Sequence, residues 1–282
     1  MTMNLVLQGP GATQPDLQRI AALARPLRTF ALNPHALRCE QVDDSIITRQ
    51  AVEMAASETR IDATFIDAAR SLADYRLVAM DMDSTLITIE CIDEIADMQG
   101  LKPQVAAITG AAMRGELEFA ESLTRRVALL QGLDASALQR VYDERLQISM
   151  GGEAMLAAVK AAGLKTLLVS GGFTFFTERL QDRLGLDFAH ANVLEIDHGK
   201  LTGRVVGGIV DAEQKMLTVE RVCAQIGIDP EQAIVMGDGA NDLKMMAIAG
   251  LSVAFRAKPV VRAQAGVALN FSGLDGLLAV LA

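Results

Sequence analysis

Two carboxylates one residue apart, Asp81 and Asp83, are the residues of this sequence best placed for chemistry, and the hydroxyls of Ser84 and Thr85 follow them directly. They come after the apolar run Leu77–Met80, and a short apolar run that ends in a polar step is typical of a buried strand. Ligands of open α/β sheets bind beyond the carboxyl ends of such strands. Two nearby carboxylates repel each other, so they require a cation or a shared proton. The alternative is a solvated turn, in which aspartate oxygens accept hydrogen bonds from backbone amides.

Two more apolar runs end in polar clusters, and a lysine stands near the start of a helical segment between them. The groups are Ser170-Gly171-Gly172 after residues 165–169, Lys215 within residues 213–226, and Gly237-Asp238-Gly239-Ala240-Asn241-Asp242 after residues 233–236. The alternation of strands and helices in this region predicts a parallel sheet covered on both faces. Because the carboxyl ends of parallel strands lie at one edge, these groups can converge with Asp81 and Asp83.

The groups expected at this edge favour phosphoryl transfer. Several carboxylates suit Mg²⁺, a hard cation that takes oxygen ligands, whereas zinc is disfavoured because these motifs contain no His or Cys. The Ser170 hydroxyl, the Gly171 amide and the Lys215 ammonium form a set that can hold a phosphate. No His–Ser or His–Cys pair supports acyl transfer, so the remaining nucleophile is an aspartate that becomes phosphorylated.

Simpler interpretations of some of these residues stay open. Ser84 and Thr85 either cap a turn or take part in the site, with equal weight. Asn241 fits a helix N-cap, and a cap can also face a phosphate. Lysines on helices usually lie on a solvated face, but Lys215 stands in a region with no other suitable lysine, which favours a role in the site.

The composition limits the function further. The 282 residues carry a formal net charge of −9 and no basic run, so nucleic acid is not an expected partner. Cys39, Cys91 and Cys223 are too far apart for a disulfide framework or a Cys-x-x-Cys metal site, as in proteins of the reducing cytoplasm. No run of about 18 apolar residues predicts a membrane span, and the first residues lack the pattern of a signal peptide.

Residues 1–74 are predicted to form a small separate α+β domain that gathers no catalytic groups. Its expected elements are strands at 3–8 and 27–31 and helices at 16–25 and 46–56. Two roles are open for it, a ligand-sensing domain or an appendage for packing or dimerisation. A homodimer is therefore one alternative for the oligomeric state.

Residues 75–282 are predicted to form an α/β unit with a helical cap inserted at about 88–150. The cap helices are expected at 91–98, 111–130 and 135–146, with Gly100 and Pro103 as a break between them. Gly151-Gly152 marks the return to the sheet, and the two glycines predict a loose hinge. A hairpin is expected at residues 188–206, turning at Asp197-His198-Gly199-Lys200.

Together the motifs, in this order around an inserted cap, resemble those of the haloacid dehalogenase-like (HAD) superfamily of phosphotransferases. Further segments are similar to the phosphoserine phosphatases within it, namely Glu90-Cys91-Ile92-Asp93-Glu94, Met113-Arg114-Gly115-Glu116-Leu117, Ser122-Leu123-Thr124-Arg125-Arg126-Val127 and Gly171-Gly172-Phe173-Thr174. The resemblance covers about residues 76–272 and implies a HAD-like Rossmannoid parallel sheet. It is weak over residues 1–74, which resemble the small, ACT-like amino-acid-binding domains attached to some relatives.

The resemblance also implies roles for individual residues. Asp81 would be the nucleophile that forms a phospho-aspartyl intermediate, and Asp83 would act as the general acid and then as the general base. Mg²⁺ would be held by the Asp81 side chain, the Asp83 backbone oxygen and Asp238. The remaining assignments place Ser170, Gly171, Lys215 and Asn241 on the phosphate, and Asp242 behind them, orienting Lys215 or a metal-bound water.

The cap would select the substrate. By resemblance, Glu90 meets the ammonium group of phosphoserine and Arg126 meets its carboxylate. Helical spacing puts Arg126 on the same face as Phe119 and Leu123, whereas Arg125 is turned to the solvent. Met113 and Phe119 are expected either to line the pocket or, with more weight, to pack in the core. The implied activity is the hydrolysis of O-phospho-L-serine, the last step of L-serine biosynthesis.

Two other functions are kept as alternatives. A related HAD phosphotransferase or phosphatase would act on another small phosphomonoester with the same residues. A signalling receiver domain also phosphorylates an aspartate at a strand end with Mg²⁺, but it needs neither Asp83 nor a cap.

Overall fold

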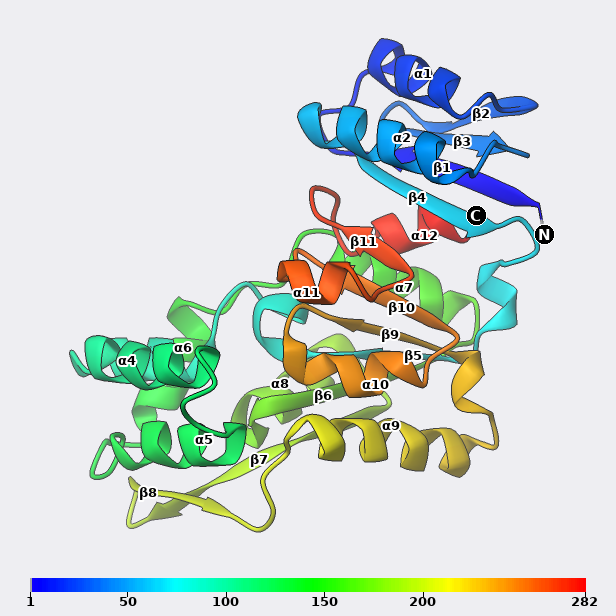
Figure 1. The fold of residues 1–282 in the computed structure, drawn as a ribbon. Helices are drawn as coiled ribbons and strands as arrows, with labels where there is room; N and C mark the ends of the chain where they lie inside the picture. The colour runs from blue at the N-terminus through cyan, green and yellow to red at the C-terminus, as the bar shows by residue number, and fades with distance from the viewer. Residues whose placement is uncertain (1) are drawn as a thin grey trace.

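The computed structural model describes residues 2–282, and of Met113 it describes the backbone only. The chain forms two sheets with a group of helices beside the second one (Figure 1). The first sheet has four antiparallel strands in the order β2-β3-β1-β4. Its elements are β1 (Met3–Gln8), α1 (Gln14–Leu23), β2 (Arg28–Asn33), β3 (Ala36–Glu40), α2 (Ile46–Glu58) and β4 (Asp62–Asp67).

The sequence did not predict β3 and β4 of this sheet. Both strands carry charged residues at positions that the fold buries, Arg38 in β3 and Asp62 in β4. The alternation of apolar and polar residues that indicates a strand is broken at these positions, so the sequence gives no clear strand signal there. The helices α1 and α2 were expected, and their N-caps Thr13 and Ser45 each accept a hydrogen bond from a backbone amide of the first turn.

The second sheet has seven strands in the order β11-β10-β9-β5-β6-β7-β8, of which only β8 is antiparallel to its neighbour. Its strands are β5 (Leu77–Met80), β6 (Lys165–Phe173), β7 (Phe188–Asp197), β8 (Lys200–Val206), β9 (Ala233–Gly237), β10 (Leu251–Phe255) and β11 (Val267–Leu269). The predicted hairpin is confirmed as β7–β8, and its turn residues His198 and Gly199 have φ of 47° and 78°.

Helices cover both faces of the second sheet, as expected for parallel strands with apolar residues on both sides. One face packs against α9 (Ala212–Ile226), α10 (Leu243–Ala247) and α11 (Pro259–Arg262). The other face packs against α7 (Gly152–Ala161), α8 (Thr174–Leu184) and α12 (Gly276–Val280). In the described part of the chain no helix is long and apolar enough to cross a membrane.

The helices inserted between β5 and α7 form the cap. They are α3 (Cys91–Asp97), α4 (Lys102–Met113), α5 (Phe119–Ala128) and α6 (Ser136–Glu144). The expected single helix at 111–130 is wrong. The helix ends at Met113, Gly115 takes a φ of 76°, and α5 begins at Phe119. Pro103 does not break a helix but lies in the first turn of α4, where a missing amide hydrogen costs nothing.

The cap is attached to the sheet at three places. Ile87 and Ile148 pair across its entrance and exit. The loop between α5 and α6 also pairs with the β7–β8 hairpin, through backbone hydrogen bonds from Gly132 and Ala135 to Leu201 and Gly199 at 2.8 Å each. In Figure 1, α5 lies beside β8. The cap is therefore anchored at its loop as well as at its two chain connections.

The prediction of a loose hinge at Gly151-Gly152 is wrong. Gly151 has a φ of 77°, and a Cβ placed on it would overlap the Asp275 carboxylate. The adjacent Met150 carbonyl accepts a hydrogen bond from the Leu274 amide at 2.8 Å. Glycine is required here because the backbone is left-handed and closely packed, which makes the connection rigid.

The first sheet packs on the second unit rather than standing apart from it. Val6 and Ile66 belong to the same buried apolar cluster as Leu277 and Val280 of α12. The Asp62 carboxylate, 2% exposed, accepts hydrogen bonds from the backbone amides of residues 270, 271 and 272 at 2.7–3.3 Å.

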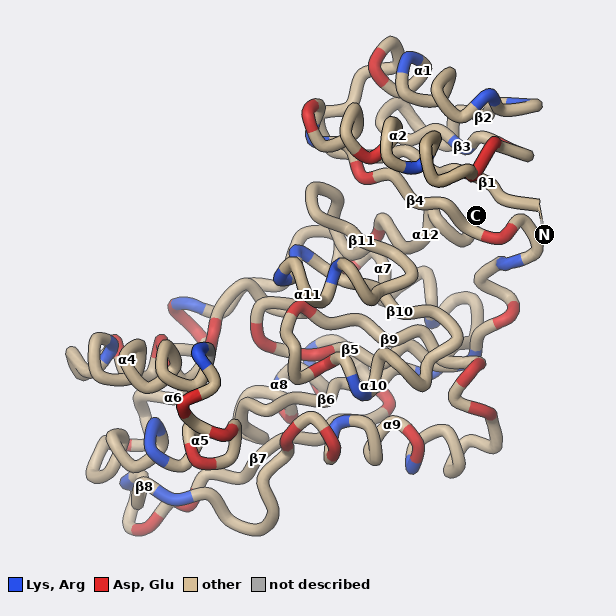
Figure 2. Tube along the Cα trace, in the orientation of Figure 1, with Lys and Arg blue, Asp and Glu red and all other residues tan. Residues whose placement is uncertain are grey.

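Lys and Arg are interspersed with Asp and Glu along the whole trace (Figure 2).

Candidate active site

The strand order brings the three polar clusters together. β5 lies between β9 and β6 in the sheet, and the three strands are parallel. Asp81 follows β5, Asp238 follows β9, and Ser170 lies within the carboxyl-terminal part of β6. The predicted convergence at one sheet edge is therefore what the structure has. The expected end of β6 at Val169 was too early, because the strand continues to Phe173.

Lys215 stands between two buried carboxylates at the bottom of this edge. Its Nζ lies 2.8 Å from Oδ1 of Asp81 and 2.8 Å from Oδ1 of Asp242, and the lysine is 1% exposed. Asp211 caps the first turn of α9 by accepting a hydrogen bond from the Gln214 amide, which sets the helix that carries Lys215. Lys215 is thus part of the site and not of a solvated helix face.

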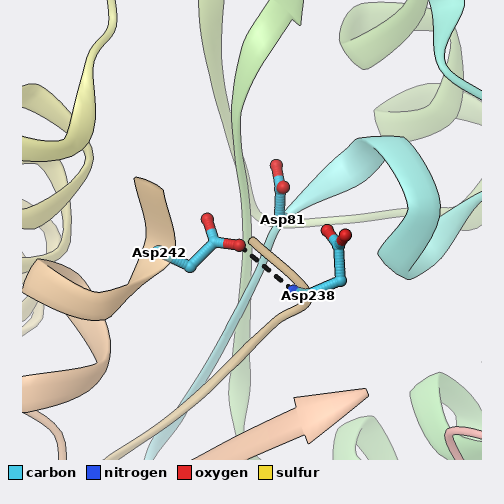
Figure 3. Close-up of side chains that lie close together, drawn as sticks. All are labelled: Asp81, Asp238 and Asp242. Carbon is cyan, nitrogen blue, oxygen red and sulfur yellow. Dashed lines mark hydrogen bonds between the residues drawn. The ribbon is translucent and has the colours of Figure 1, made fainter. Parts of the chain in front are cut away.

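The three carboxylates of Asp81, Asp238 and Asp242 lie close to one another (Figure 3). They offer oxygens that are all within 4.8 Å of each other. Asp242 is fully buried, and its Oδ2 accepts hydrogen bonds from the amides of Asp238 at 3.1 Å and Gly239 at 3.0 Å. Both oxygens of Asp242 are thus already bound, whereas Asp238 has only a 3.4 Å hydrogen bond from the Thr85 hydroxyl.

The crowding of these groups changes their acidity. Burial, and next the Asp242 carboxylate, raise the pKa of Asp238 to about 6. Burial and Asp242 also raise the pKa of Asp81 well above its usual range, although Lys215 opposes this. Burial alone would lower the pKa of Lys215, but the carboxylates of Asp242 and Asp81 outweigh it and raise that pKa. Two of the three carboxylates thus share one ammonium and Asp238 has none, which leaves an excess of negative charge that a cation would relieve.

Asp83 differs from Asp81 in its surroundings. Its Oδ1 accepts a hydrogen bond from the Cys91 amide at 3.2 Å, at the start of the cap. Burial, and next the carboxylate of Glu90, raise the pKa of the Asp83 carboxyl to about 7. A carboxyl with this pKa is present in both protonation states near neutral pH, which is what a residue that gives and takes a proton needs.

The hydroxyls that follow Asp83 contact carboxylates of the site and do not cap the turn. Ser84 has a φ of 57°, a strained conformation for a residue with a side chain, and its hydroxyl donates to Oε1 of Glu90 at 2.7 Å. The Thr85 hydroxyl, 0% exposed, donates to Asp238 as described above. Asn241 is not a helix N-cap either, because it lies within the turn Ala240–Asp242 that precedes α10.

Hydrogen bonds from within the core fix the conformation of residues 170–172. The Ser170 hydroxyl, 1% exposed, accepts a hydrogen bond from the Gly172 amide at 2.9 Å. The side chain of Asn192 in β7 donates to the Gly171 carbonyl and accepts from the Val210 amide, both at 2.8 Å. A Cβ on Gly171 would come within 2.9 Å of the Phe119 ring, so the cap reaches down to this glycine.

A cavity of about 520 Å³ lies between this sheet edge and the cap. Its core side is lined by Asp81, Asp83, Ser170, Gly171, Asp238 and Asn241. Its cap side is lined by Glu90, Phe119, Ser122, Leu123 and Arg126. Lys215 is not among the lining residues and lies behind Asp81. Burial lowers the pKa of Arg126, and the carboxylates of Asp93 and Glu90 oppose that shift.

The face predicted for α5 agrees with the structure. Phe119, Leu123 and Arg126 all line the cavity, and Arg125 is exposed and paired with Glu121 at 2.6 Å. The expectation for the Met113 side chain lies outside the described part of the chain.

Asn192 and Lys258 are among the residues of the site that sequence reasoning missed. Asn192 carries no motif, and a single asparagine in a strand gives no signal that it holds a neighbouring loop. Lys258 lines the cavity from the first residue before α11, is exposed, and donates its backbone amide to the Asp238 carbonyl at 3.1 Å. Its position next to Pro259 fits the start of a helix and gives no signal of a place in the site.

Comparisons with known proteins agree on the family. The model of the haloacid dehalogenase-like hydrolases matches residues 78–247. A phosphoserine phosphatase of Polaromonas sp. (strain JS666) is 58% identical over 212 residues, which are 73% of this chain and 90% of that protein. The HAD family hydrolase t0658 of Salmonella enterica serovar Typhi has a TM-score of 0.90 at 31% identity, covering 100% of this chain and 99% of that one.

A further solved structure represents a phospho-aspartyl intermediate analogue of a phosphoserine phosphatase. It is 36% identical, with a TM-score of 0.69, and covers 74% of this chain and 99% of that chain. The family model spans the strand ends and the cap around the cavity, and it leaves out the N-terminal sheet.

Proposed function

The chain belongs to the haloacid dehalogenase-like hydrolases, and we propose that within this family it hydrolyses O-phospho-L-serine to L-serine and phosphate. The observation that carries the proposal is the pairing of Asp81 with Lys215 at one side of a cavity whose other side carries Glu90 and Arg126. One side suits a phosphoryl group and the other an amino acid. In a cell this reaction is the last step of L-serine synthesis.

In the first half-reaction Asp81 attacks the phosphorus atom. Its Oδ1 is held by the Met82 amide at 2.7 Å and by Lys215 at 2.8 Å, so the carboxylate is fixed before the substrate arrives. The bond between phosphorus and the serine oxygen breaks, and the protonated carboxyl of Asp83 donates its proton to that oxygen. Serine leaves, and Asp81 carries the phosphoryl group.

In the second half-reaction the roles reverse. The carboxylate of Asp83 takes a proton from a water molecule, which attacks the phosphorus atom and releases Asp81 and phosphate. The pKa of about 7 for Asp83 supports both uses of one residue. The Ser170 hydroxyl, the amides around Gly171 and the side chain of Asn241 would hold the phosphoryl oxygens in both steps.

The carboxylates of the site fit Mg²⁺. Three aspartates, of which Asp81 and Asp242 are buried and Asp238 is half-buried, offer oxygens within 4.8 Å of each other and form a hard, electron-rich donor set beside one lysine. Asp81, Asp238 and the backbone oxygen of Asp83 would hold the ion, because both oxygens of Asp242 already accept hydrogen bonds. When bound, the ion would neutralise charge on the phosphoryl oxygens. Asp242 would keep Lys215 and the Asp238 loop in place.

Recognition of the amino acid would fall to the cap. Arg126 can bind the substrate carboxylate with two parallel hydrogen bonds. Glu90, held by the Ser84 hydroxyl at 2.7 Å, can pair with the ammonium group. A phosphomonoester without these charges would gain nothing from either residue.

The test is hydrolysis by three variants. Asp81→Asn should abolish release of phosphate from phosphoserine and leave the circular dichroism spectrum unchanged. Glu90→Gln and Arg126→Met should reduce kcat/KM for phosphoserine by a factor of about 30 or more, the equivalent of losing one charged contact, and should reduce kcat/KM for an aryl phosphate far less. Equal losses on both substrates would sink the assignment of the amino-acid end.

A further inference from the structure

Two hydroxyls on the cap wall of the cavity are buried and have no hydrogen-bond partner among the described residues. They belong to Thr109 in α4 and Ser122 in α5. Both residues line the cavity, and Ser122 is 1% exposed. The two helices pack against each other, so the hydroxyls approach the cavity from neighbouring elements.

The same helix shows what a satisfied hydroxyl looks like. Thr124, two residues after Ser122 and exposed, donates to the Ala120 carbonyl four residues earlier at 2.8 Å. A serine inside a helix ordinarily makes this bond. For Ser122 the corresponding carbonyl is that of Glu118, which accepts only the Ser122 amide at 2.9 Å. The Ser122 hydroxyl therefore makes no hydrogen bond to its own helix.

Ser122 also stands one turn before Arg126. Residues four apart on a helix are neighbours on one face, and both side chains line the cavity. The guanidinium Nε of Arg126 donates weakly to the Ser122 carbonyl at 3.4 Å, which leaves its terminal nitrogens for another acceptor. A carboxylate that meets Arg126 in the cavity would therefore come close to the Ser122 hydroxyl.

A buried polar group without a partner lowers stability, so such groups are rare in folded proteins. When two of them line one cavity, a ligand that satisfies both explains them. We propose that the Ser122 hydroxyl binds the substrate carboxylate together with Arg126, and that the Thr109 hydroxyl bonds to the same amino-acid end. This inference rests on the proposed function and adds two specificity-determining residues to it.

The first test compares Ser122→Ala with Thr124→Ala, its matched control on the outer side of the same helix. With Mg²⁺ present, Ser122→Ala should raise KM for phosphoserine roughly tenfold, the usual effect of losing a hydrogen bond to a charged group. Its KM for an aryl phosphate should not change. Thr124→Ala should behave as the wild type on both substrates.

The second test measures ligand binding and the melting temperature. A purely structural role of Ser122 would leave binding unchanged and would lower the melting temperature of the alanine variant. In the Asp81→Asn background, which cannot turn over, Ser122→Ala should weaken phosphoserine binding by the same factor in calorimetry. The melting temperature of the free protein should stay the same or rise, because an unsatisfied buried group is removed. Thr109→Val, which keeps the side-chain shape, should repeat both results.

The outcomes separate this inference from the proposed function. Wild-type protein that does not hydrolyse phosphoserine would overturn both. Wild-type protein that does so, with an unchanged KM in Ser122→Ala, would overturn this inference alone. A lower melting temperature of Ser122→Ala would also overturn it, since the hydroxyl would then have a partner within the fold.

Discussion

At the scale of single residues, the site is organised around a shortage of positive charge. Asp81 and Asp242 share the one ammonium of Lys215, and Asp238 stands beside them with no cation of its own within an ion pair's distance. A buried charge that loses its partner is far more costly than an exposed one. The same arrangement makes these carboxylates good ligands, because the repulsion between them is relieved when a cation binds.

Removing the Asp242 carboxylate should show how much of the fold depends on this arrangement. Asp242→Ala leaves Lys215 with one partner and two backbone amides with none, so the free energy of unfolding should fall by about 3–5 kcal/mol. Urea unfolding of the metal-free protein measures it. The control is Glu213→Ala, which breaks the exposed pair of Lys244 and Glu213 at 3.7 Å and should cost less than about 1 kcal/mol. Similar losses in both variants would contradict the argument.

The raised pKa values predict how stability depends on pH. In the metal-free fold Asp83 titrates at about 7 and Asp238 at about 6, whereas an unfolded aspartate titrates at about 3.9. The folded state thus holds these protons more tightly, and stability from this source is lost as pH rises from about 4 through 7. Mg²⁺ bound to the Asp238 carboxylate would replace the proton of that group, so it should raise the melting temperature more at pH 8 than at pH 5. An equal shift at both pH values would show that the ion does not bind these carboxylates.

At the scale of elements, the connection at Gly151 shows what sequence could and could not tell. Two adjacent glycines predicted a flexible backbone, but Gly151 adopts a left-handed conformation and packs closely against Asp275. The strands that end at Asp81, Ser170 and Asp238 were predictable because a short apolar run before a polar step depends only on neighbouring residues. The space around Gly151 was not, because Asp275 lies far away in the chain.

The same reason explains the other misses. The strand with Arg38 and the strand with Asp62 were overlooked because their charged residues are buried by contacts from distant segments. The cap's position followed from a run of helical segments without a strand, but the break between α4 and α5 at Gly115 was hidden by continuous helical periodicity. The unpaired hydroxyl of Ser122 has no signature in sequence at all, since a missing partner is a property of three dimensions.

The rigidity of the cap connection can be tested with two glycines. Gly151→Ala would combine a left-handed backbone with an overlap on Asp275, so it should destabilise the protein by well over the roughly 1–2 kcal/mol that a left-handed alanine costs. Gly163→Ala, with a φ of 83° and open space around its Cβ, should cost only that smaller amount. Thermal unfolding of both variants measures the difference. Equal costs would mean that the connection relaxes freely.

At the scale of the whole molecule, the N-terminal sheet shares its core with the catalytic unit. Val6 and Ile66 lie in one apolar cluster with Leu277, and Asp62 binds three consecutive backbone amides after β11. If the sheet were a separate appendage, these residues would not share an apolar cluster with the catalytic unit. The residues after β11 also reach Met150 at the exit of the cap, through the Leu274 amide. The first sheet therefore supports the segment that fixes the cap connection.

Breaking the Asp62 contact should loosen this support. Asp62→Ala leaves three buried amides without an acceptor, so it should lower the free energy of unfolding by about 2–4 kcal/mol. Amide hydrogen exchange at residues 270–275 should rise with it. Asp67→Ala is the control, because that carboxylate at the end of the same strand accepts only from the Ala69 amide. If exchange at 270–275 is the same in both variants, the contact does not hold the segment.

The loop that joins α5 to α6 has a consequence for how substrate enters. Backbone hydrogen bonds join residues 132–135 to residues 199–201, so the lower part of the cap is continuous with the edge of the central sheet. A body fixed along both of its sides cannot swing as one piece about its two chain connections. If the cap moves when substrate enters, we therefore expect the movement to lie in α4, Lys102–Met113, and not in the cap as a whole.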